Sequence, residues 1–392
     1  MFVKENISAK GLSIIALSAD IALFKNERIL DPLWAKKFPG AEWMPTLSDN
    51  LTKRGFRVTT TDVALSHVEQ GYWNVENVCV IQHLNDPESE RLIELGAKPL
   101  IVTAFESPLY VPKFYDEVNI IASKFRHRMF FSGLLNGFLD QQGSNHHLRF
   151  PCYHEEDIVE AVAWCERDFL VTVVANKYAL PFSRLYLFHP VDALKWLKRC
   201  LRTFISFDIS KLMKVKNANQ LQDIRYSAFC FFGKKGGLKL YGKGWETLKN
   251  LPYVYRKKLS PILSKLKPEV CNHKLQTIAQ YKFSLCFENC SYPGYVTEKI
   301  IECFVAGVIP VYLGAPDIKD FVPEASFIDV RDYTDWDELL VKLESIDENE
   351  AKKMIQSGRD FLKTDVGKLH SFEGFSALIE SIVINTKLTK DE

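Results

Sequence analysis

Over about the first 150 residues, short apolar runs alternate with polar segments of helical periodicity. This alternation is typical of an α/β domain. Residues 78–81 and 99–103 are the clearest predicted strands, and residues 88–96 between them predict a short helix that ends at Gly96. Residues 1–167 are therefore expected to form one α/β domain.

The most regular pattern lies between residues 281 and 323, where it predicts a strand, a loop, a helix and a second strand. Residues 283–287 are an apolar run of the kind found in a fully covered parallel strand. Thr297 is placed to cap the helix, and Gly307 is placed to end it before the apolar run 308–313. Together these segments make one βαβ unit of ordinary length.

The remaining apolar runs predict the rest of a second domain and a helical C-terminal part. The buried run 169–174 predicts the first strand of the second domain, so we place the boundary near Arg167. We assign residues 168–350 to this domain and expect residues 351–392 to pack back on the first domain as helices. The expected segments are a strand at 326–330 and helices at 338–343, 350–362 and 372–384.

Polar residues gather where the strand 283–287 ends and the next helix begins. Ligands of parallel sheets bind at this edge, where helix N-termini offer free N–H groups to an anion. Lys299 is informative because a cation in the first turn opposes the helix dipole unless an anion is bound there. A bound phosphate would remove the conflict, and a solvated Lys299 paired with Glu302 is the alternative. The edge holds Glu288, Asn289, Tyr295, Glu298 and Lys299.

These residues resemble the signature of the α1,3/α1,4-fucosyltransferases, glycosyltransferase family 10. The similarity lies in Phe-Glu-Asn at 287–289, Tyr-Val-Thr-Glu-Lys at 295–299 and the run from Gly307 to Pro323. The resemblance implies a GT-B fold, with two Rossmann-like domains facing each other across a cleft. It also implies a GDP-fucose site with Glu298 on the ribose and Lys299 on the pyrophosphate. The other implied donor-binding residues here are Glu288, Asn289, Tyr295 and Thr297.

Glu106 follows the predicted strand 99–103 and precedes Ser107 and Pro108. By itself, a glutamate in this position is typically a turn or cap residue. The fucosyltransferases carry a similar Glu-Ser-Pro segment in the acceptor domain, and the resemblance implies that Glu106 is the catalytic base. Such a role is chemically reasonable, because an inverting transfer needs a carboxylate to take the proton of the attacking hydroxyl.

The family also presents an arginine at a helix start, for which this chain offers two candidates. We prefer Arg225, because its helical segment leads into a turn at 240–245 that resembles the family's next glycine-rich turn. Arg184 is the alternative. The planar guanidinium of an arginine binds phosphate oxygens in pairs and keeps its charge. Residues 173–176 are similar to the family's Val-Val-Ser-Asn, but Ala175 replaces the serine and lacks its hydroxyl.

An apparent insertion at about residues 185–219 separates these two arginines and is locally basic. A basic amphipathic helix in this segment could lie on an anionic membrane surface, which would suit an enzyme with a lipid-linked acceptor. A helix packed on its own domain, with a solvated basic face, is the alternative. The basic residues are Lys195, Lys198, Arg199, Arg202, Lys211, Lys214 and Lys216.

Two other patterns are open to a metal-binding interpretation, and we prefer a structural one for each. His146 and His147 lie in the polar segment 136–147, which predicts a solvated loop. Residues 335–337, Asp-Trp-Asp, match a pattern by which many glycosyltransferases hold a metal, but they precede an acidic helix, so capping explains them. Residues 154–157 likewise have the acidic first turn of a helix. We expect no metal requirement.

Length, composition and charge limit the number of domains, the kinds of partner and the cellular compartment that we expect. With 392 residues, of which 47% are hydrophobic, the chain can form two domains with substantial cores. A formal net charge of +1 argues against a nucleic-acid partner. The nine cysteines indicate reduced thiols. No signal peptide or membrane span is evident, which favours a bacterial or viral cytoplasmic enzyme or a shortened protein. The basic insertion would allow such an enzyme to bind peripherally to the inner membrane face.

The sequence thus predicts an inverting transferase that moves fucose from GDP-fucose to a saccharide hydroxyl. The resemblance implies α1,3 or α1,4 linkage to N-acetylglucosamine or glucose, as in lipopolysaccharide glycans. One alternative is the same chemistry with another GDP-linked sugar. A second is a catalytically silent protein that binds nucleotide sugars.

Overall fold

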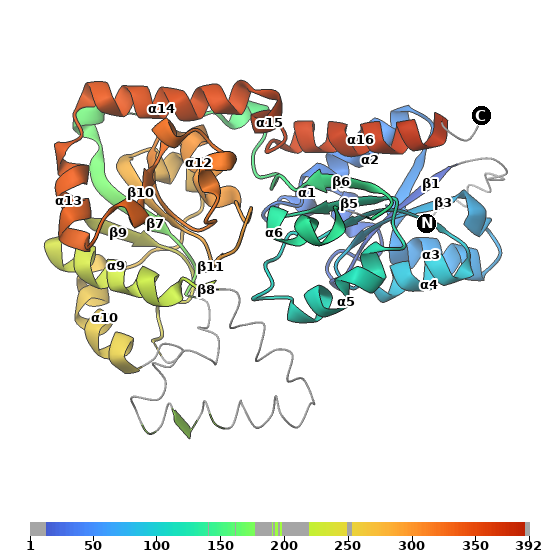
Figure 1. Ribbon diagram of the computed structural model, residues 1–392, viewed down its shortest axis with the longest axis horizontal. Coiled ribbons are helices and arrows are strands. Elements are labelled where there is room, and N and C mark those ends of the chain that lie inside the picture. Colours follow the sequence, from blue (N-terminus) through green and yellow to red (C-terminus); the bar gives the residue numbers. More distant parts are fainter. Residues whose placement is uncertain are drawn as a thin grey trace. The chain divides into compact units, whose positions relative to one another are not determined.

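The computed structural model describes residues 13–139, 141–160, 162–176, 219–248 and 253–388, together with residues 190, 193, 194 and 197. These residues form two compact units, each built on its own parallel sheet (Figure 1). The first unit consists of the described residues up to Phe105, Phe114–Glu155 and those from Lys368 onward. The second consists of Glu106–Lys113 and the described residues of Glu156–Gly367.

The first unit contains a six-stranded parallel sheet in the order β2-β1-β3-β4-β5-β6. The predicted strands at 78–81 and 99–103 are confirmed as β3 and β4. The predicted helix between them is α4 (Pro87–Leu95), which ends at Gly96 with a φ of 114°. The strands are β1 (Ile14–Leu17), β2 (Arg57–Thr60), β3 (Val78–His83), β4 (Lys98–Thr103), β5 (His127–Phe130) and β6 (Ser144–His147).

The prediction of a loop over 136–147 is wrong for its last four residues. Residues Ser144–His147 form β6 and pair in parallel with β5, with His146 opposite Met129. A strand at the edge of a sheet needs only one hydrogen-bonded neighbour and can be polar, so its sequence carries little hydrophobic alternation. The pairing with β5 is a tertiary interaction that the local pattern did not reveal.

A helix at residues 154–157 is also not formed, because only a single 3₁₀ turn is present at Glu155–Asp157. The backbone that follows hydrogen-bonds to distant parts of the second unit. The Val159 N–H donates to the carbonyl of Val305 at 3.1 Å, and Arg359 donates to the carbonyl of Val159 at 2.5 Å. These contacts take the place of the hydrogen bonds that a helix would supply.

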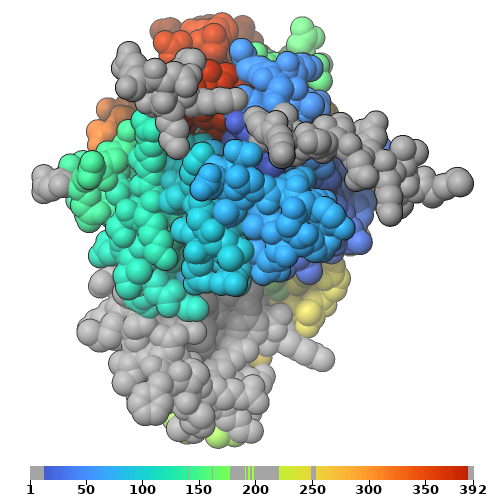
Figure 2. Space-filling view, turned by 90° about the vertical axis from the view of Figure 1, so that its right-hand side faces the viewer, coloured from blue at the N-terminus to red at the C-terminus, as the bar shows by residue number. Residues whose placement is uncertain are grey.

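The C-terminal helix α16 (Phe372–Leu388) packs on α2 (Trp43–Lys53) within the first unit. The Ser376 hydroxyl donates to the carbonyl of Trp43 at 2.9 Å, and the Trp43 and Phe375 rings meet edge to face. Figure 2 shows the early part of the chain, coloured blue to teal, over the face of this unit that is turned to the viewer. The other helices along its sequence are α1 (Pro32–Ala35), α3 (Thr61–Glu69), α5 (Pro112–Ala122) and α6 (Ser132–Leu135).

The second unit contains a five-stranded parallel sheet in the order β13-β12-β10-β7-β9, together with a short antiparallel ribbon. The predicted strand at 326–330 is shorter than expected, since only Ile328 and Asp329 pair with β12. The sheet strands are β7 (Asp168–Val173), β9 (Leu238–Tyr241), β10 (Tyr281–Phe287), β12 (Ile309–Leu313) and β13 (Ile328–Asp329); the ribbon strands are β8 (Asn219–Gln220) and β11 (Cys290–Ser291).

The connections of this sheet run in opposite directions from its middle. From β10 the chain passes through α12 (Glu298–Ala306) to β12, and from β7 it reaches β9 on the other side through α9 (Gln222–Lys235). Right-handed crossovers place the two helices on opposite faces, as Figure 1 shows. The neighbouring ends of β7 and β10 are therefore a topological switch point, where ligands of such sheets bind.

The predicted helices of the C-terminal third are all present. The helix predicted from Thr297 is α12, and Gly307 ends it with a φ of 65°. The long helix α14 belongs to the second unit, where Gly358 packs so closely on Phe304 that a Cβ would lie 2.4 Å from the ring. The remaining helices are α10 (Tyr253–Leu266), α11 (Lys274–Ile278), α13 (Trp336–Ser345), α14 (Glu348–Lys363) and α15 (Asp365–Lys368).

Arg184 and nearly all of the basic insertion at 185–219 lie outside the described residues. The amphipathic helix predicted there stays a prediction. Among the helices that can be described, none combines the length and the apolar character needed to cross a membrane.

Candidate functional site

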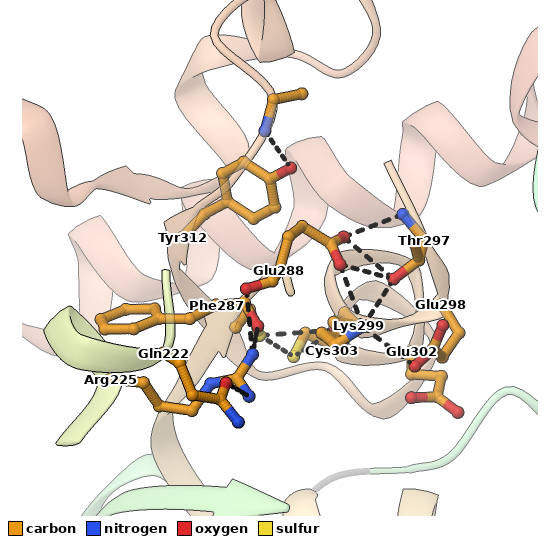
Figure 3. Close-up of polar contacts among 12 residues, drawn as sticks. Gln222, Arg225, Phe287, Glu288, Thr297, Glu298, Lys299, Glu302, Cys303 and Tyr312 are labelled. Atoms are coloured by element: carbon orange, nitrogen blue, oxygen red, sulfur yellow. Dashed lines mark hydrogen bonds and ion pairs between the residues drawn. The ribbon is translucent and has the colours of Figure 1, made fainter. Parts of the chain in front are cut away.

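The site is built around Glu288, the first residue after β10. Its side chain is completely buried, and its backbone N–H donates to the carbonyl of Leu313 at the end of β12 at 2.8 Å. Its carboxylate faces the first turn of α12 (Figure 3). Glu288 thus joins the ends of two neighbouring strands to the start of the helix between them.

The anion at the N-terminus of α12 is the carboxylate of Glu288. It accepts hydrogen bonds from the Thr297 backbone N–H at 2.9 Å and from the Thr297 hydroxyl at 2.9 and 2.8 Å. Thr297 is the residue that precedes the helix, as predicted, but its hydroxyl does not cap the helix because it is bound to Glu288. A negative group in this position is stabilised by the free N–H groups of the first turn.

Lys299 completes this arrangement. Its ammonium donates to Glu288 at 2.9 Å, to the Thr297 hydroxyl at 2.8 Å and to Glu298 at 3.2 Å, which accounts for all three N–H groups. The side chain is only 18% exposed. Burial alone would lower the pKa of Lys299, but the Glu288 and Glu298 carboxylates raise it above its usual value.

The alternative in which Lys299 is a solvated residue paired with Glu302 is wrong. Glu302 instead forms an ion pair with Lys274, which comes from α11. Glu298 lies among these charges. Burial works against its ionised form, yet Lys299 and Lys274 hold the pKa of Glu298 at about 2. The carboxylate is therefore charged at neutral pH.

Arg225 reaches the same site from α9 and is 4% exposed. Its guanidinium donates to the carbonyls of Phe287 and Glu288 at 2.6 and 2.9 Å, and to the side chain of Gln222 at 2.9 Å. Three of its five N–H groups are thus used within the protein. Burial lowers the pKa of Arg225. Arg225 therefore ties α9 to the end of β10.

Asn289 and Tyr295 lie on the loop between β10 and α12. The Asn289 carbonyl accepts from the Leu221 N–H at 3.2 Å, just before α9, which places this loop beside the helix that carries Arg225. Tyr295 is 2% exposed, and burial together with the nearby Glu288 raises its pKa well above the usual value.

Glu106 is the first residue of the segment Glu106–Lys113, which packs as part of the second unit. Its charge acts on neighbouring residues of the site. Besides burial, Glu106 contributes to the raised pKa of Tyr295 and to that of the Cys290 thiol, which is about 12. The charge of Glu106 is therefore within electrostatic reach of the loop that follows β10.

Several residues of this site were not foreseen from the sequence. Tyr110, in the same segment as Glu106, has a pKa that burial raises and that Arg225 and Lys299 lower. Lys274 and Gln222 carry no local pattern that marks them, because each reaches the site from a separate helix. Only the order of the strands could have indicated that these helices meet here.

A small cavity of about 20 Å³ lies beside these charged groups, at the ends of β7 and β10. By volume it can hold about one water molecule. It is lined in part by Thr172, Arg225, Cys286, Lys299, Glu302 and Cys303. The charged residues Arg225, Lys299 and Glu302 thus line part of this cavity, together with apolar side chains.

The Asp-Trp-Asp segment has the structural role predicted for it. Asp335 accepts a hydrogen bond from the Glu338 N–H at 2.9 Å and so caps α13. Asp337 forms an exposed ion pair with Lys235 at 3.2 Å.

His146, the other residue considered for metal binding, lies in the first unit. One of its ring nitrogens is 3.1 Å from a ring nitrogen of His127.

Residues 256–355 match a family model described as glycosyltransferase family 10 (fucosyltransferase), C-terminal part. The chain is 34% identical over 125 residues to an α-(1,3)-fucosyltransferase of Helicobacter pylori, covering 30% of this chain and 26% of that protein. It is 40% identical over 85 residues to 4-galactosyl-N-acetylglucosaminide 3-α-L-fucosyltransferase 9 of Cricetulus griseus, covering 21% and 24%. The similar region thus spans about a quarter of these relatives.

Solved structures resemble nearly the full length of the chain. An α1,3-fucosyltransferase crystallised with GDP has a TM-score of 0.51 at 17% identity, covering 96% of this chain and 92% of that one. Sucrose-phosphate synthase of Thermosynechococcus elongatus has a TM-score of 0.56 at 11% identity, covering 97% and 100%. At such low identity these likenesses show the fold, which is the GT-B type predicted, with two Rossmann-like units.

Proposed function

Because residues 256–355 match the model of glycosyltransferase family 10, the fucosyltransferase family, we infer that this part of the chain belongs to that family. From this premise we propose that the protein transfers fucose from GDP-fucose to a hydroxyl of a saccharide acceptor, with inversion at the anomeric carbon. The observation that carries the proposal is the buried Glu288–Lys299 pair at the switch point of the second sheet. This pair holds a cation at the place where nucleotide ligands of such sheets bind.

The donor would bind at the start of α12, next to the loop that carries Asn289 and Tyr295. Lys299 is the cation best placed for the pyrophosphate, because its bond to Glu298, at 3.2 Å, is the longest of its three and the easiest to exchange. Glu298, released from Lys299, could accept hydrogen bonds from the ribose hydroxyls. Thr297 and Glu288 would hold Lys299 in place during the exchange.

Arg225 would support the site rather than carry the whole phosphate contact. Three of its N–H groups are already donated to Gln222, Phe287 and Glu288, so at most two remain for a ligand. Its fixed charge still favours an anion nearby. Two cations held by the protein could stabilise the departing GDP, so we propose that the reaction needs no metal ion.

In the chemical step the acceptor oxygen would attack the anomeric carbon of fucose as the bond from that carbon to the β-phosphate oxygen breaks. The proton of the acceptor hydroxyl would pass to the Glu106 carboxylate. The electron pair of the broken bond leaves with GDP, whose added negative charge is stabilised by Lys299 and Arg225. A single displacement of this kind inverts the configuration.

The acceptor is proposed to be N-acetylglucosamine or glucose, joined through an α1,3 or α1,4 linkage, in a glycan that a lipid can carry. Two observations favour the fucosyltransferase over a silent binding protein. Glu106 belongs to the same unit as the donor site, and its charge reaches Tyr295. A binding protein would have no need of a carboxylate there.

The test is a comparison of nucleotide sugars, since a ligand that binds only the folded protein raises its thermal stability. We expect GDP-fucose to stabilise the protein more than GDP-mannose, UDP sugars or CMP sugars. GDP release should then require a saccharide acceptor and should persist in EDTA. Stronger stabilisation by GDP-mannose would favour another GDP sugar, and binding without acceptor-dependent GDP release would favour the silent protein. Activity lost in EDTA and restored by Mn²⁺ would overturn the metal-independent proposal.

Peripheral binding to an anionic membrane is a separate proposal, based on the seven basic residues of the insertion. Co-sedimentation with anionic vesicles should decrease as salt increases, because surface charges are screened within a Debye length. A variant in which alanine replaces all four of Lys195, Lys198, Arg199 and Arg202 should co-sediment less. Equal sedimentation of this variant would contradict the proposal.

A further inference from the structure

Two thiols lie in contact directly below the first turn of α12. The Cys286 sulfur, on β10, is 3.2 Å from the Cys303 sulfur, on α12. Both side chains are buried, with exposures of 3% and 1%. Neither residue has a role in the proposed transfer, so the contact calls for a different explanation.

Both thiols hydrogen-bond to the same acceptor, the backbone carbonyl of Lys299. The distances from this oxygen are 3.4 Å to the Cys286 sulfur and 3.3 Å to the Cys303 sulfur, and Figure 3 shows Cys303 beside Lys299. The ammonium of the same lysine binds Glu288. Any change at the sulfur pair therefore acts on the backbone of the residue proposed to hold the pyrophosphate.

We propose that Cys286 and Cys303 are a modification site, a dithiol that a small peroxide converts into a disulfide joining β10 to α12. The two sulfurs need to approach by only about 1 Å to reach bonding distance. The water-sized cavity beside them is lined by both cysteines, so only an oxidant close in size to water can approach the sulfurs through it. A bulky disulfide such as oxidised glutathione would not fit there.

The chemistry proceeds in two steps. One sulfur attacks the O–O bond of hydrogen peroxide and becomes a sulfenic acid as one water leaves. The second thiol then displaces the hydroxyl as another water, forming the S–S bond. In total, two thiols and one peroxide give one disulfide and two waters, so the cysteines are oxidised and the peroxide is reduced.

When Cys286 is the attacking sulfur, the first step is slow at neutral pH, because burial raises the pKa of its thiol well above the usual value. The second step is fast by comparison, since the partner thiol is already in contact. The disulfide therefore forms before either sulfur is oxidised further, and its formation accelerates as the pH rises.

Closure of the disulfide also affects the donor site, a consequence that rests on the proposed function. The disulfide has no S–H groups, so the Lys299 carbonyl loses both thiol donors. The bond also draws the helix turn of Cys303 towards β10. We expect the shifted lysine to bind GDP about tenfold more weakly.

The first experiment uses the full, reduced chain and hydrogen peroxide. Remaining thiols are alkylated after unfolding, and peptides are mapped by mass spectrometry. We expect a peptide pair joined through Cys286 and Cys303, lost on treatment with dithiothreitol. The Cys303→Ala variant should not form it, whereas Cys230→Ala, which removes another buried thiol, should. If Cys303→Ala does not fold, the peptide map of the parent protein alone decides whether the Cys286–Cys303 disulfide forms.

The proposal is overturned if Cys286 and Cys303 both remain open to alkylation while the exposed Cys165 is oxidised. Sulfinic or sulfonic acid at either position, without the linked peptides, also overturns it. The second experiment compares GDP binding by the reduced and oxidised protein. Equal affinity would overturn the effect on the site. Failure of the reduced protein to bind GDP would instead refute the proposed function, and the peptide map would still decide on the dithiol.

Discussion

The carboxylate of Glu288 lies 2.9 Å from the ammonium of Lys299, and the glutamate side chain is completely buried. The N-terminus of α12 thus has its own anion, and the lysine is held in position without a ligand. A cation that is already oriented loses less freedom when a phosphate binds than a solvated one would. The fold also depends on this pair, because the charge that remains after one partner is removed would be buried without a counter-charge.

Replacing Glu288 with glutamine should strongly destabilise the second unit. The change keeps the shape of the side chain but leaves Lys299 without its buried counter-charge, which typically costs about 3 kcal/mol. Denaturant unfolding of the parent and the variant, in the absence of nucleotide, measures this loss of stability. The matched control is Glu324→Gln, which breaks the exposed pair with Lys319 and should leave the midpoint unchanged. Equal effects of the two variants would show that the buried pair is not important for stability.

Replacing Lys299 or Arg225 with alanine should weaken GDP binding by ~1.5–3 kcal/mol each, the typical loss when a charged hydrogen bond is removed. Arg225→Ala should also lower the free energy of unfolding, because it frees the carbonyls of Phe287 and Glu288. Calorimetric titration below the unfolding transition separates the two effects. Weaker binding in Arg184→Ala with unchanged binding in Arg225→Ala would show that the wrong arginine was assigned.

Replacing Glu106 with glutamine should lower kcat by at least about a hundredfold while GDP-fucose still binds as in the parent. A positioned carboxylate acts on the transition state, so its loss changes the rate of the chemical step and leaves donor affinity alone. The exposed Glu94, on α4, is the control, and Glu94→Gln should retain full activity. Near-parental turnover of Glu106→Gln would mean that this glutamate is a turn residue.

His154 should make the first unit less stable at high pH. Its ring binds Glu42 at 3.2 Å and Glu373 at 2.6 Å, and these two carboxylates raise its pKa to about 9 from 6.5, against partial burial. The protonated ring therefore stabilises the fold fully below about pH 6.5, and this contribution is lost as the pH rises through about 9. Unfolding midpoints of the parent and His154→Gln should differ at pH 6 and converge by about pH 10. A difference that does not change with pH would contradict the ion pairs.

The amino-acid sequence by itself determined the elements that depend on local chemistry. The helix α12 and its end at Gly307 follow from the spacing of apolar residues and from a glycine at a positive φ. The same reasoning gave α4, β10 and β12. The signature at 287–299 marked the loop proposed to bind the donor, because its residues are close together in the chain and share one turn and one helix start.

Only the tertiary structure decided how distant residues combine. Glu288 serves as the anion of α12 because the end of β10 lies next to that helix, whereas the pattern had suggested an external phosphate. Arg225 is anchored to backbone carbonyls, and β6 pairs despite a polar sequence. The Cys286–Cys303 contact likewise joins a strand to a helix. Such contacts depend on which strands become neighbours and which crossovers cover them, and a local pattern of polar and apolar residues does not contain that information.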